Sequence, residues 1–260
     1  MKKLLCAIFV GLLLVLGIYS YNNNLKETQV STFTKDTLND YEDIIIRRGD
    51  ENQKLIALTF DDGPDEDYTP QVLDILKKYN IKATFFTVGE KVEWHPEIVK
   101  RQYKEGHEIG NHTFTHINVC HRGYDDIYKE ISQTQEAIKK VIGIEPKIFR
   151  PPYRAINKEM CSIVKEKDMN VILWSELDPR DWSNPGVYYI SNTILTKVKN
   201  GNIILLHDYN NKRASTSQTI QALDTVIPAL KEKGYKFVTV SELIENLDKD
   251  YEQNNNTGFQ

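Results

Sequence analysis

Residues 55–64 read LIALTFDDGP: an apolar run from Leu55 to Phe60, then Asp61 and Asp62, then a Gly-Pro turn. A short continuous apolar run bounded by turn residues predicts a strand that is buried on both faces. Such strands occur in parallel sheets that are covered by helices. Two carboxylates directly after the strand lie at its carboxyl end, which is where parallel barrels carry their active sites. This stretch therefore predicts an α/β fold and marks one edge of a functional site.

Strand and helix patterns alternate along the rest of the chain. The predicted strands are Leu55–Phe60, Ala83–Val88, Glu108–Gly110, Ile148–Arg150, Asn170–Trp174, Asn202–Leu206 and Lys236–Thr239. The predicted helices are Thr69–Tyr79, Pro96–Glu105, Tyr124–Ile142, Lys158–Lys167, Val187–Val198, Ser217–Lys233 and Ser241–Leu247. About seven strand–helix units with no separate second core predict a closed or distorted (β/α) barrel. An open doubly wound sheet is the alternative.

Composition and charge exclude several classes of protein. The chain has 260 residues, of which 40% are hydrophobic and 27% charged, with a formal net charge of −4. It has no run of basic residues, so we expect no nucleic-acid partner, and nothing in the sequence predicts a protein partner. The spacing of Cys6, Cys120 and Cys161 does not fit a zinc cluster, although Cys120 and Cys161 could pair if the fold brought them together.

The amino terminus has the pattern of a membrane-targeting segment. Lys2 and Lys3 precede an uncharged, mostly apolar run, Leu4–Tyr21. This run is longer than a typical signal-peptide core and close to the roughly 20 residues that span a bilayer. We therefore predict an uncleaved anchor helix over residues 1–21, with a cleaved signal peptide and secretion as the alternative. The two lysines place the rest of the chain outside the cytoplasm.

The anchor divides the remaining chain into three predicted parts. Residues 22–52 are polar and without a sustained period, which is typical of a stalk or linker. Residues 53–247 carry the alternating strands and helices and form the predicted catalytic domain. Residues 248–260 are polar and rich in asparagine, and we expect a tail.

Three side chains at the strand ends form a candidate metal site. Asp62 follows the first strand, and His112 and His116 follow the third. One carboxylate and two imidazoles suit a borderline divalent metal such as Zn²⁺, with Co²⁺ or another divalent ion as the alternative. The H-x-x-x-H spacing brings two imidazoles together if the backbone turns helically between them. Three protein ligands leave room for water and substrate, as in catalytic rather than structural sites.

Other strand ends supply candidate acid and base groups. Asp61 can take a proton from an attacking water, and Arg150 can hold Asp61 ionised and oriented. His207 can give a proton to a departing amine, because an imidazole titrates near neutral pH. Asp181 is the predicted carboxylate partner of His207, and Asp208 is the alternative.

Apolar residues beside these groups predict a small pocket. Leu205 and Trp182 could enclose a methyl group. The sequence has no G-x-S-x-G elbow, no P-loop and no G-x-G-x-x-G. Water, rather than a side chain, is therefore the predicted nucleophile.

Five segments resemble, in order, the motifs of the polysaccharide deacetylases with a NodB-like domain, carbohydrate esterase family 4. They are Thr59–Pro64 (TFDDGP), His112–His116 (HTFTH), Arg150–Tyr153 (RPPY), Asp178–Trp182 (DPRDW) and Leu205–Asp208 (LLHD). The resemblance covers the chain from about Leu55 to Ile244. It implies a distorted (β/α) barrel that binds one divalent metal, commonly zinc.

The resemblance also implies a role for each residue of the site. The metal ligands would be Asp62, His112 and His116. Asp61 would be the general base, oriented by Arg150, and His207 would be the general acid, supported by Asp181. The N–H of Tyr153 would stabilise the oxyanion, and Trp182 and Leu205 would shape the acetyl pocket. Two positions depart from the family pattern. Arg154 stands where glycine is usual, which affects the fit of the substrate, and Ile117 stands where proline is common.

The leading functional hypothesis is a hydrolase that removes N-acetyl groups from an extracellular or cell-wall polysaccharide. Peptidoglycan, with its N-acetylglucosamine and N-acetylmuramic acid residues, is the expected polymer. An O-acetyl polysaccharide esterase is the first alternative, because the same activated water attacks either carbonyl. A glycan-binding relative without catalysis is the second, although the complete set of acid, base and ligand residues argues against it.

Overall fold

A computed structural model of the protein describes residues 39–210 and 214–247. The chain divides into two compact units, residues 1–42 and 43–260, and the second contains the sheet and its helices. The predicted anchor over residues 1–21, most of the predicted stalk and the predicted tail lie outside the described residues. Within the described ranges, no helix has both the length and the apolar character needed to cross a bilayer.

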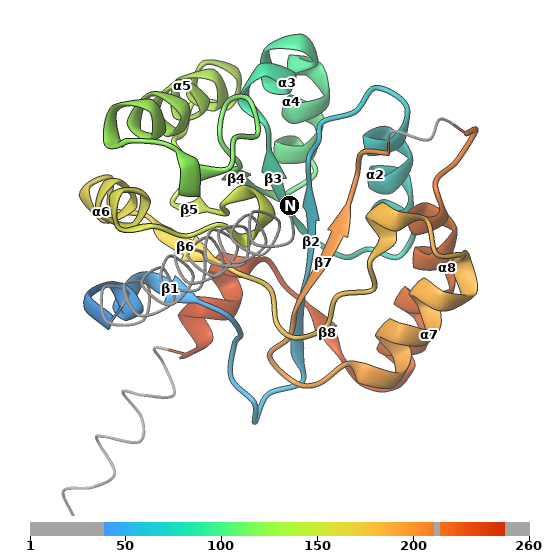
Figure 1. The fold of residues 1–260 in the computed structure, drawn as a ribbon. Coiled ribbons are helices and arrows are strands. Elements are labelled where there is room, and N and C mark those ends of the chain that lie inside the picture. Colours follow the sequence, from blue (N-terminus) through green and yellow to red (C-terminus); the bar gives the residue numbers. More distant parts are fainter. Residues whose placement is uncertain (1–38, 211–213, 248–260) are drawn as a thin grey trace, which may run out of the picture. The chain divides into compact units, whose positions relative to one another are not determined.

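Parallel strands form one curled, half-barrel sheet (Figure 1). The order of its eight strands is β1-β6-β5-β4-β3-β2-β7, with β8 paired to β2. They are β1 (Ile45–Ile46), β2 (Leu55–Asp61), β3 (Thr84–Thr87), β4 (Glu108–Asn111), β5 (Ile148–Phe149), β6 (Asn170–Ile172), β7 (Ile203–His207) and β8 (Lys236–Phe237). From β2 to β6 the order follows the chain, and β7 returns beside β2, as in a barrel. This confirms the predicted parallel barrel-like architecture over the doubly wound alternative.

The barrel is open along one seam, between the edge strands β1 and β7. The chain after β6 bridges this seam through Ser175. Its N–H donates to the carbonyl of Ile203 (3.0 Å), and its hydroxyl accepts from the Ile203 N–H (3.0 Å). The same hydroxyl donates to the carbonyl of Arg47 (3.1 Å), the residue after β1. Side chains from the two edges of the sheet therefore gather around this seam.

Strand β2 shows how the sequence sets the two faces of the sheet. Ile56, Leu58 and Phe60 belong to the core between the sheet and the outer helices. Ala57 belongs to a second cluster, with apolar residues of β3, β5, β6 and β7, inside the curled sheet. Because side chains alternate along a strand, Thr59 and Asp61 point to the same side as Ala57. Asp61 thus lies inside the barrel at its carboxyl-end mouth.

Helices surround the curled sheet (Figure 1). They are α2 (Tyr68–Lys78), α3 (Gly89–Trp94), α4 (Pro96–Lys104), α5 (Tyr124–Ile142), α6 (Lys158–Glu166), α7 (Val187–Lys197), α8 (Gln218–Glu232) and a helical segment at 240–247. Short 3-10 turns lie at η1 (Asn39–Ile44), η2 (Val119–His121), η3 (Pro152–Arg154) and η4 (Asp181–Ser183). The caps follow local chemistry: Asn157 accepts from the N–H of Met160 at the start of α6, and Gly143 ends α5 in the left-handed conformation (φ 82°).

Two elements differ from the sequence predictions. Strand β1 lies inside the predicted stalk, and residues 43–52 belong to the compact second unit, so the fold begins earlier than residue 53. The apolar run that contains β1, Ile44–Ile46, is too short to show a period in polar surroundings. Helix α3 was not predicted, because its six residues, GEKVEW, include only one buried apolar side chain, Val92.

Candidate active site

Asp62, His112 and His116 converge at the mouth of the barrel. Asp62 follows β2, and the two histidines follow β4. Asp62 Oδ1 lies 3.4 Å from Nε2 of His112 and 3.0 Å from Nε2 of His116, and the imidazole centroids are 5.1 Å apart. One donor atom of each residue lies within 4.8 Å of the other two. The structure therefore assembles the predicted ligand set.

The geometry of this cluster fits a divalent metal. Two ligands at about 2.0–2.1 Å from a tetrahedral zinc lie roughly 3.3 Å apart, close to the two observed O–N separations. His112 Nδ1 lies 2.7 Å from the carbonyl of Arg150. That hydrogen bond requires a proton on Nδ1, so Nε2 is the nitrogen that can offer its lone pair to a metal when one is bound. His116 Nδ1 contacts the hydroxyl of Tyr153 at 3.1 Å, which orients the second ring.

The local electrostatics keep Asp62 negatively charged. Burial alone would raise the pKa of this carboxyl group. Hydrogen bonds from His112 and His116, together with the charge of His207, outweigh burial and hold the pKa well below its usual value. An ionised carboxylate beside two imidazoles is a donor set that suits a borderline cation such as zinc.

The loop from His112 to His116 is not the helical turn that the spacing suggested. Thr113 and His116 have left-handed backbone conformations, with φ of 65° and 59°. Such values are rare for a β-branched residue and require support from surrounding structure. Glu130 of α5 supplies it, because its carboxylate accepts from the N–H groups of Phe114 (2.8 Å) and Thr115 (2.7 Å). Glu130 is a supporting residue that sequence reasoning missed.

Arg150 and Asp61 form a buried ion pair beside the cluster. Nη1 of Arg150 donates to Oδ1 of Asp61 at 2.7 Å, and the Arg150 side chain is 0% exposed. The same nitrogen donates to Thr59 Oγ1 (2.7 Å), and Nε donates to the carbonyl of Ile172 (3.2 Å). The guanidinium also stacks 4.0 Å from the centroid of the Phe86 ring. Arg150 therefore fixes the orientation of the Asp61 carboxylate.

His207 is held by Asp181, as predicted, and not by the alternative Asp208. Nδ1 of His207 lies 2.8 Å from Oδ1 of Asp181, and the His207 N–H donates to Oδ2 (2.8 Å). Thr219, which sequence reasoning missed, donates to the same Oδ2. Burial opposes the charged ring, but the charge and hydrogen bond of Asp181 raise the pKa of His207 to about 10. Asp208 is buried and accepts instead from Thr69 (2.7 Å).

A cleft of about 480 Å³ joins these groups. Its lining includes all of the candidate residues except the buried Arg150 and Asp181, with Trp182, Leu205 and Tyr153 on its walls. Leu205 is 4% exposed, whereas Trp182 and Tyr153 are 52% and 65% exposed. Trp174 also lines the cleft, and sequence reasoning missed it because it reads only as the end of an apolar strand.

Cys120, Cys161 and His107 do not line this cleft. Cys120 and Cys161 do not form a disulfide with each other; Cys161 is buried and Cys120 is exposed. His107, for which we expect a structural role, is buried, and its Nδ1 accepts from the N–H of Ala83 (3.2 Å).

Comparison with known proteins identifies the family. The sequence model of the polysaccharide deacetylase family matches residues 48–172. A peptidoglycan-N-acetylglucosamine deacetylase of Bacillus cereus is 47% identical over 74% of this chain and 89% of its own length. The crystal structure of a peptidoglycan N-acetylglucosamine deacetylase in complex with 4-naphthalen-1-yl-N-oxidanyl-benzamide superposes with a TM-score of 0.74, at 38% identity over 79% of this chain and 94% of that one.

A further solved structure brings a metal into the comparison. A family 4 acetyl xylan esterase from Clostridium thermocellum, in complex with a cobalt ion, has a TM-score of 0.68 and 39% identity, over 74% of this chain and 90% of that one. The protein belongs to the polysaccharide deacetylase family, a family of hydrolases.

Proposed function

We propose that this protein removes N-acetyl groups from the glycan of the bacterial cell wall, with peptidoglycan as its polymer. The observation that carries this proposal is the cleft itself, in which the Asp61–Arg150 pair, the His207–Asp181 pair and the Asp62 cluster meet. The likeness to a peptidoglycan-N-acetylglucosamine deacetylase along most of both chains supports the choice of substrate.

A divalent metal, zinc or cobalt, held by Asp62, His112 and His116 would supply a Lewis acid that activates water and polarises the amide carbonyl. Asp61 would accept the proton of the attacking water. Arg150 keeps this base aimed into the cleft through the 2.7 Å hydrogen bond. The buried position of both side chains keeps bulk water from competing for the hydrogen bond.

His207 would give its proton to the departing amine. Asp181 orients the ring through Nδ1, so that Nε2 carries the transferable proton. The raised pKa keeps the ring charged at neutral pH in the absence of other cations. Amide cleavage needs such an acid, because an unprotonated amine is a poor leaving group.

The walls of the cleft suit the acetyl group. Leu205 and Trp182 would enclose its methyl group, and the N–H of Tyr153 would donate to the oxyanion. Tyr153 has a left-handed backbone conformation, with φ of 59°.

The proposed location is outside the cytoplasmic membrane, where wall glycan is found. A membrane anchor over residues 1–21 remains a prediction from the sequence, with cleavage and secretion as its alternative.

Removal of O-acetyl groups is the second candidate function. It is favoured by the likeness to an acetyl xylan esterase over most of both chains. An alkoxide departs with less help from an acid than an amine does. His207→Ala should therefore abolish activity on amides in either case, and ester cleavage that survives this substitution would favour the second candidate.

Replacing Asp61 with Asn tests the proposed function. The variant should retain the metal, because Asp61 is outside the ligand set, yet release acetate from N-acetylglucosamine oligomers at least about a hundredfold more slowly. Asp125→Asn, on the exposed start of α5, is the control for loss of a carboxylate and should behave as the unmodified protein does. Full activity of Asp61→Asn would refute the assignment of the base.

A further inference from the structure

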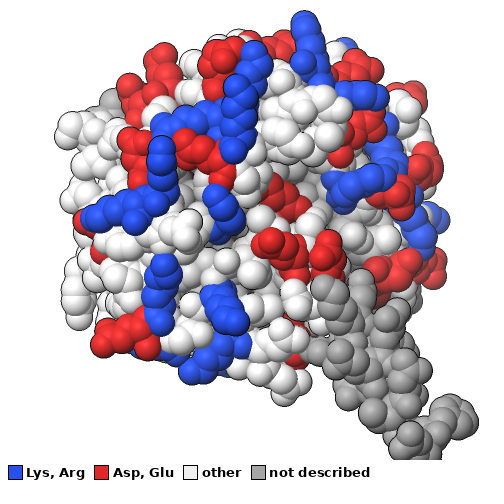
Figure 2. All heavy atoms as spheres, turned by 180° about the vertical axis from the view of Figure 1, so that it is seen from behind, with Lys and Arg blue, Asp and Glu red and all other residues white. Residues whose placement is uncertain are grey.

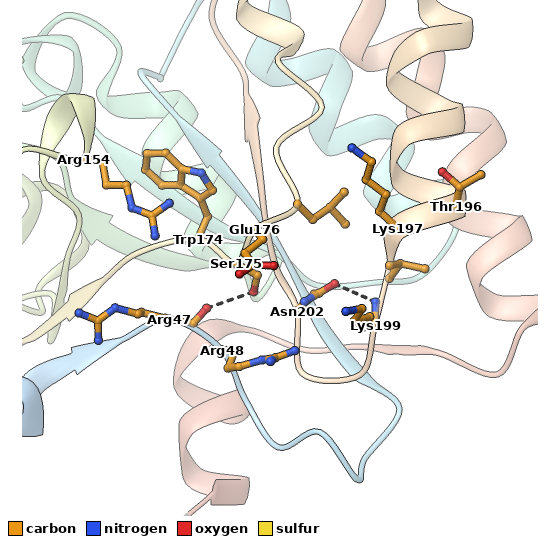
Figure 3. A pocket seen from close by; sticks show the side chains of 12 residues that line it. Arg47, Arg48, Arg154, Trp174, Ser175, Glu176, Thr196, Lys197, Lys199 and Asn202 are labelled. Carbon is orange, nitrogen blue, oxygen red and sulfur yellow. Dashed lines mark hydrogen bonds between the residues drawn. The ribbon is translucent and has the colours of Figure 1, made fainter.

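A second cavity, of about 650 Å³, lies at the open seam of the barrel (Figure 3). Its walls come from the residues after β1, the bridge after β6 and the end of α7. The cavity and the active-site cleft share one wall, the side chain of Trp174. Arg154 provides a second connection between the two, because it lines the cavity and directly follows Tyr153, which lines the cleft. A glycan bound in the cleft would therefore have this cavity as a neighbour.

The cavity is strongly basic in a protein that is acidic overall. Its twelve lining residues include five cations and a single carboxylate, that of Glu176. The cations are Arg47, Arg48, Arg154, Lys197 and Lys199. The chain as a whole carries a net charge of −4. On the face seen in Figure 2, basic and acidic side chains are interspersed. The concentration of positive charge in the cavity is thus a local feature, and it favours an anionic ligand.

Three of these cations have no carboxylate partner among the described residues. They are Arg154, Lys197 and Lys199, whereas Arg48 pairs with Glu51. The guanidinium carbon of Arg154 lies 4.9 Å from the centroid of the Trp174 ring, and a cation–π contact of this kind does not occupy the N–H donors of the guanidinium. Lys197 approaches the cavity from the opposite side, from the end of α7 (Figure 3). An anion placed between them would meet charge from both walls.

The backbone of Arg154 adds a second, independent observation. Its φ is 57°, in the left-handed region where a residue other than glycine is disfavoured by roughly 1 kcal/mol. A glycine at this position would remove this cost. The presence of arginine here indicates that the side chain, rather than the turn, serves a purpose.

We propose that this basic cavity binds an anionic group, a carboxylate or a phosphate, that is carried by the glycan in the active-site cleft. The cavity thereby makes acidic glycans better substrates than neutral ones of equal length. This inference rests on the proposed deacetylase function and deepens it, since it names the class of polymer that the site selects. In peptidoglycan the lactyl and peptide carboxylates supply such groups.

The test compares acetate release from three sets of N-acetylated oligosaccharides of equal length: neutral, carboxylate-bearing and phosphate-bearing. We expect kcat/KM to be highest for one of the two charged sets, and that set identifies the source of the anion. The preference should shrink as salt is raised, because exposed charges are screened. Equal kcat/KM on all three sets would overturn the inference while leaving the deacetylase function intact, and no release from any set would instead overturn the function itself.

Variants connect the preference to the cavity. Arg154→Gln should lower kcat/KM for the preferred acidic set about two- to fivefold, as expected for one partly exposed ion pair. Adding Lys197→Gln and Lys199→Gln should bring the loss to about tenfold. Activity on the neutral set should stay within about twofold. The control variant Lys140→Gln with Lys158→Gln removes two exposed charges elsewhere on the protein. It should change kcat/KM for neither the acidic nor the neutral set. Equal losses on acidic and neutral sets in the Arg154 variant would show a merely structural role and refute the inference.

Discussion

The buried pair of Arg150 and Asp61 makes a quantitative prediction about stability. Both side chains are almost fully buried, at 0% and 5% exposed, and their 2.7 Å hydrogen bond joins full charges. Replacing Arg150 with Met keeps a similar apolar stem but leaves the Asp61 carboxylate buried without its partner. Removing one partner of a buried pair costs about 3–5 kcal/mol. We expect the free energy of unfolding of Arg150→Met to fall by that amount.

The double variant distinguishes the ion pair from simple loss of packing. Asp61→Asn alone leaves the buried Arg150 guanidinium without its charged partner, and Nη2 of this group already lacks a hydrogen-bond partner among the described residues. This variant should also be destabilised by about 3–5 kcal/mol. The combination removes both charges and should be no less stable than either single variant. Urea unfolding of the four proteins, all metal-free so that ligand binding does not contribute, measures the coupling. Costs that simply add would refute the account of Asp61 as a base held by Arg150.

Three further predictions follow from other parts of the fold. Asp181→Asn should lower the pKa of His207 from about 10, which would be measured as a titration of the ring resonance at lower pH in the metal-free protein. In the unmodified protein the Asp181–His207 pair contributes its full stabilisation below pH about 6.5 and loses it as the pH rises toward 10, and the variant should lack this contribution. An unchanged titration would contradict the pairing. Burial lowers the pKa of His107 to about 4. The free energy of unfolding should therefore fall by up to about 1.4 kcal/mol per pH unit as the pH is lowered below about 6.5. His107→Gln should reduce this dependence on pH, and parallel stability curves for the two proteins would contradict the prediction. Gly63→Ala should destabilise the protein by about 1–3 kcal/mol, because the added methyl group would overlap the buried carboxylate of Asp208; an unchanged melting temperature would disprove the close contact.

The site was predictable from the sequence where strand ends carry it. The apolar run of β2 ends in Asp61, and parallel strands bring all such ends to one mouth, so the convergence with His112 and His207 follows from topology alone. The alternation of side chains in β2 also explains why Asp61 enters the barrel while Phe60 packs outside. These inferences need only local pattern and chain order.

Features that depend on distant contacts were not predictable in the same way. The left-handed turn at Thr113 exists because Glu130, on a different element, holds the loop through backbone N–H groups. The H-x-x-x-H spacing alone was equally compatible with a helical turn, which the loop does not adopt. The cations of the basic cavity likewise come from residues far apart in the sequence, such as Arg47 and Lys199, so no run of basic residues predicts the cavity.

The measurement that tests the central claim most directly is acetate release from purified peptidoglycan as the metal content is changed. The protein would be assayed as isolated, after chelation, and after the addition of Zn²⁺ or Co²⁺. The arrangement of Asp62, His112 and His116 predicts that chelation abolishes release and that one metal per chain restores it. Acetate release that persists in the fully metal-free protein would contradict the account.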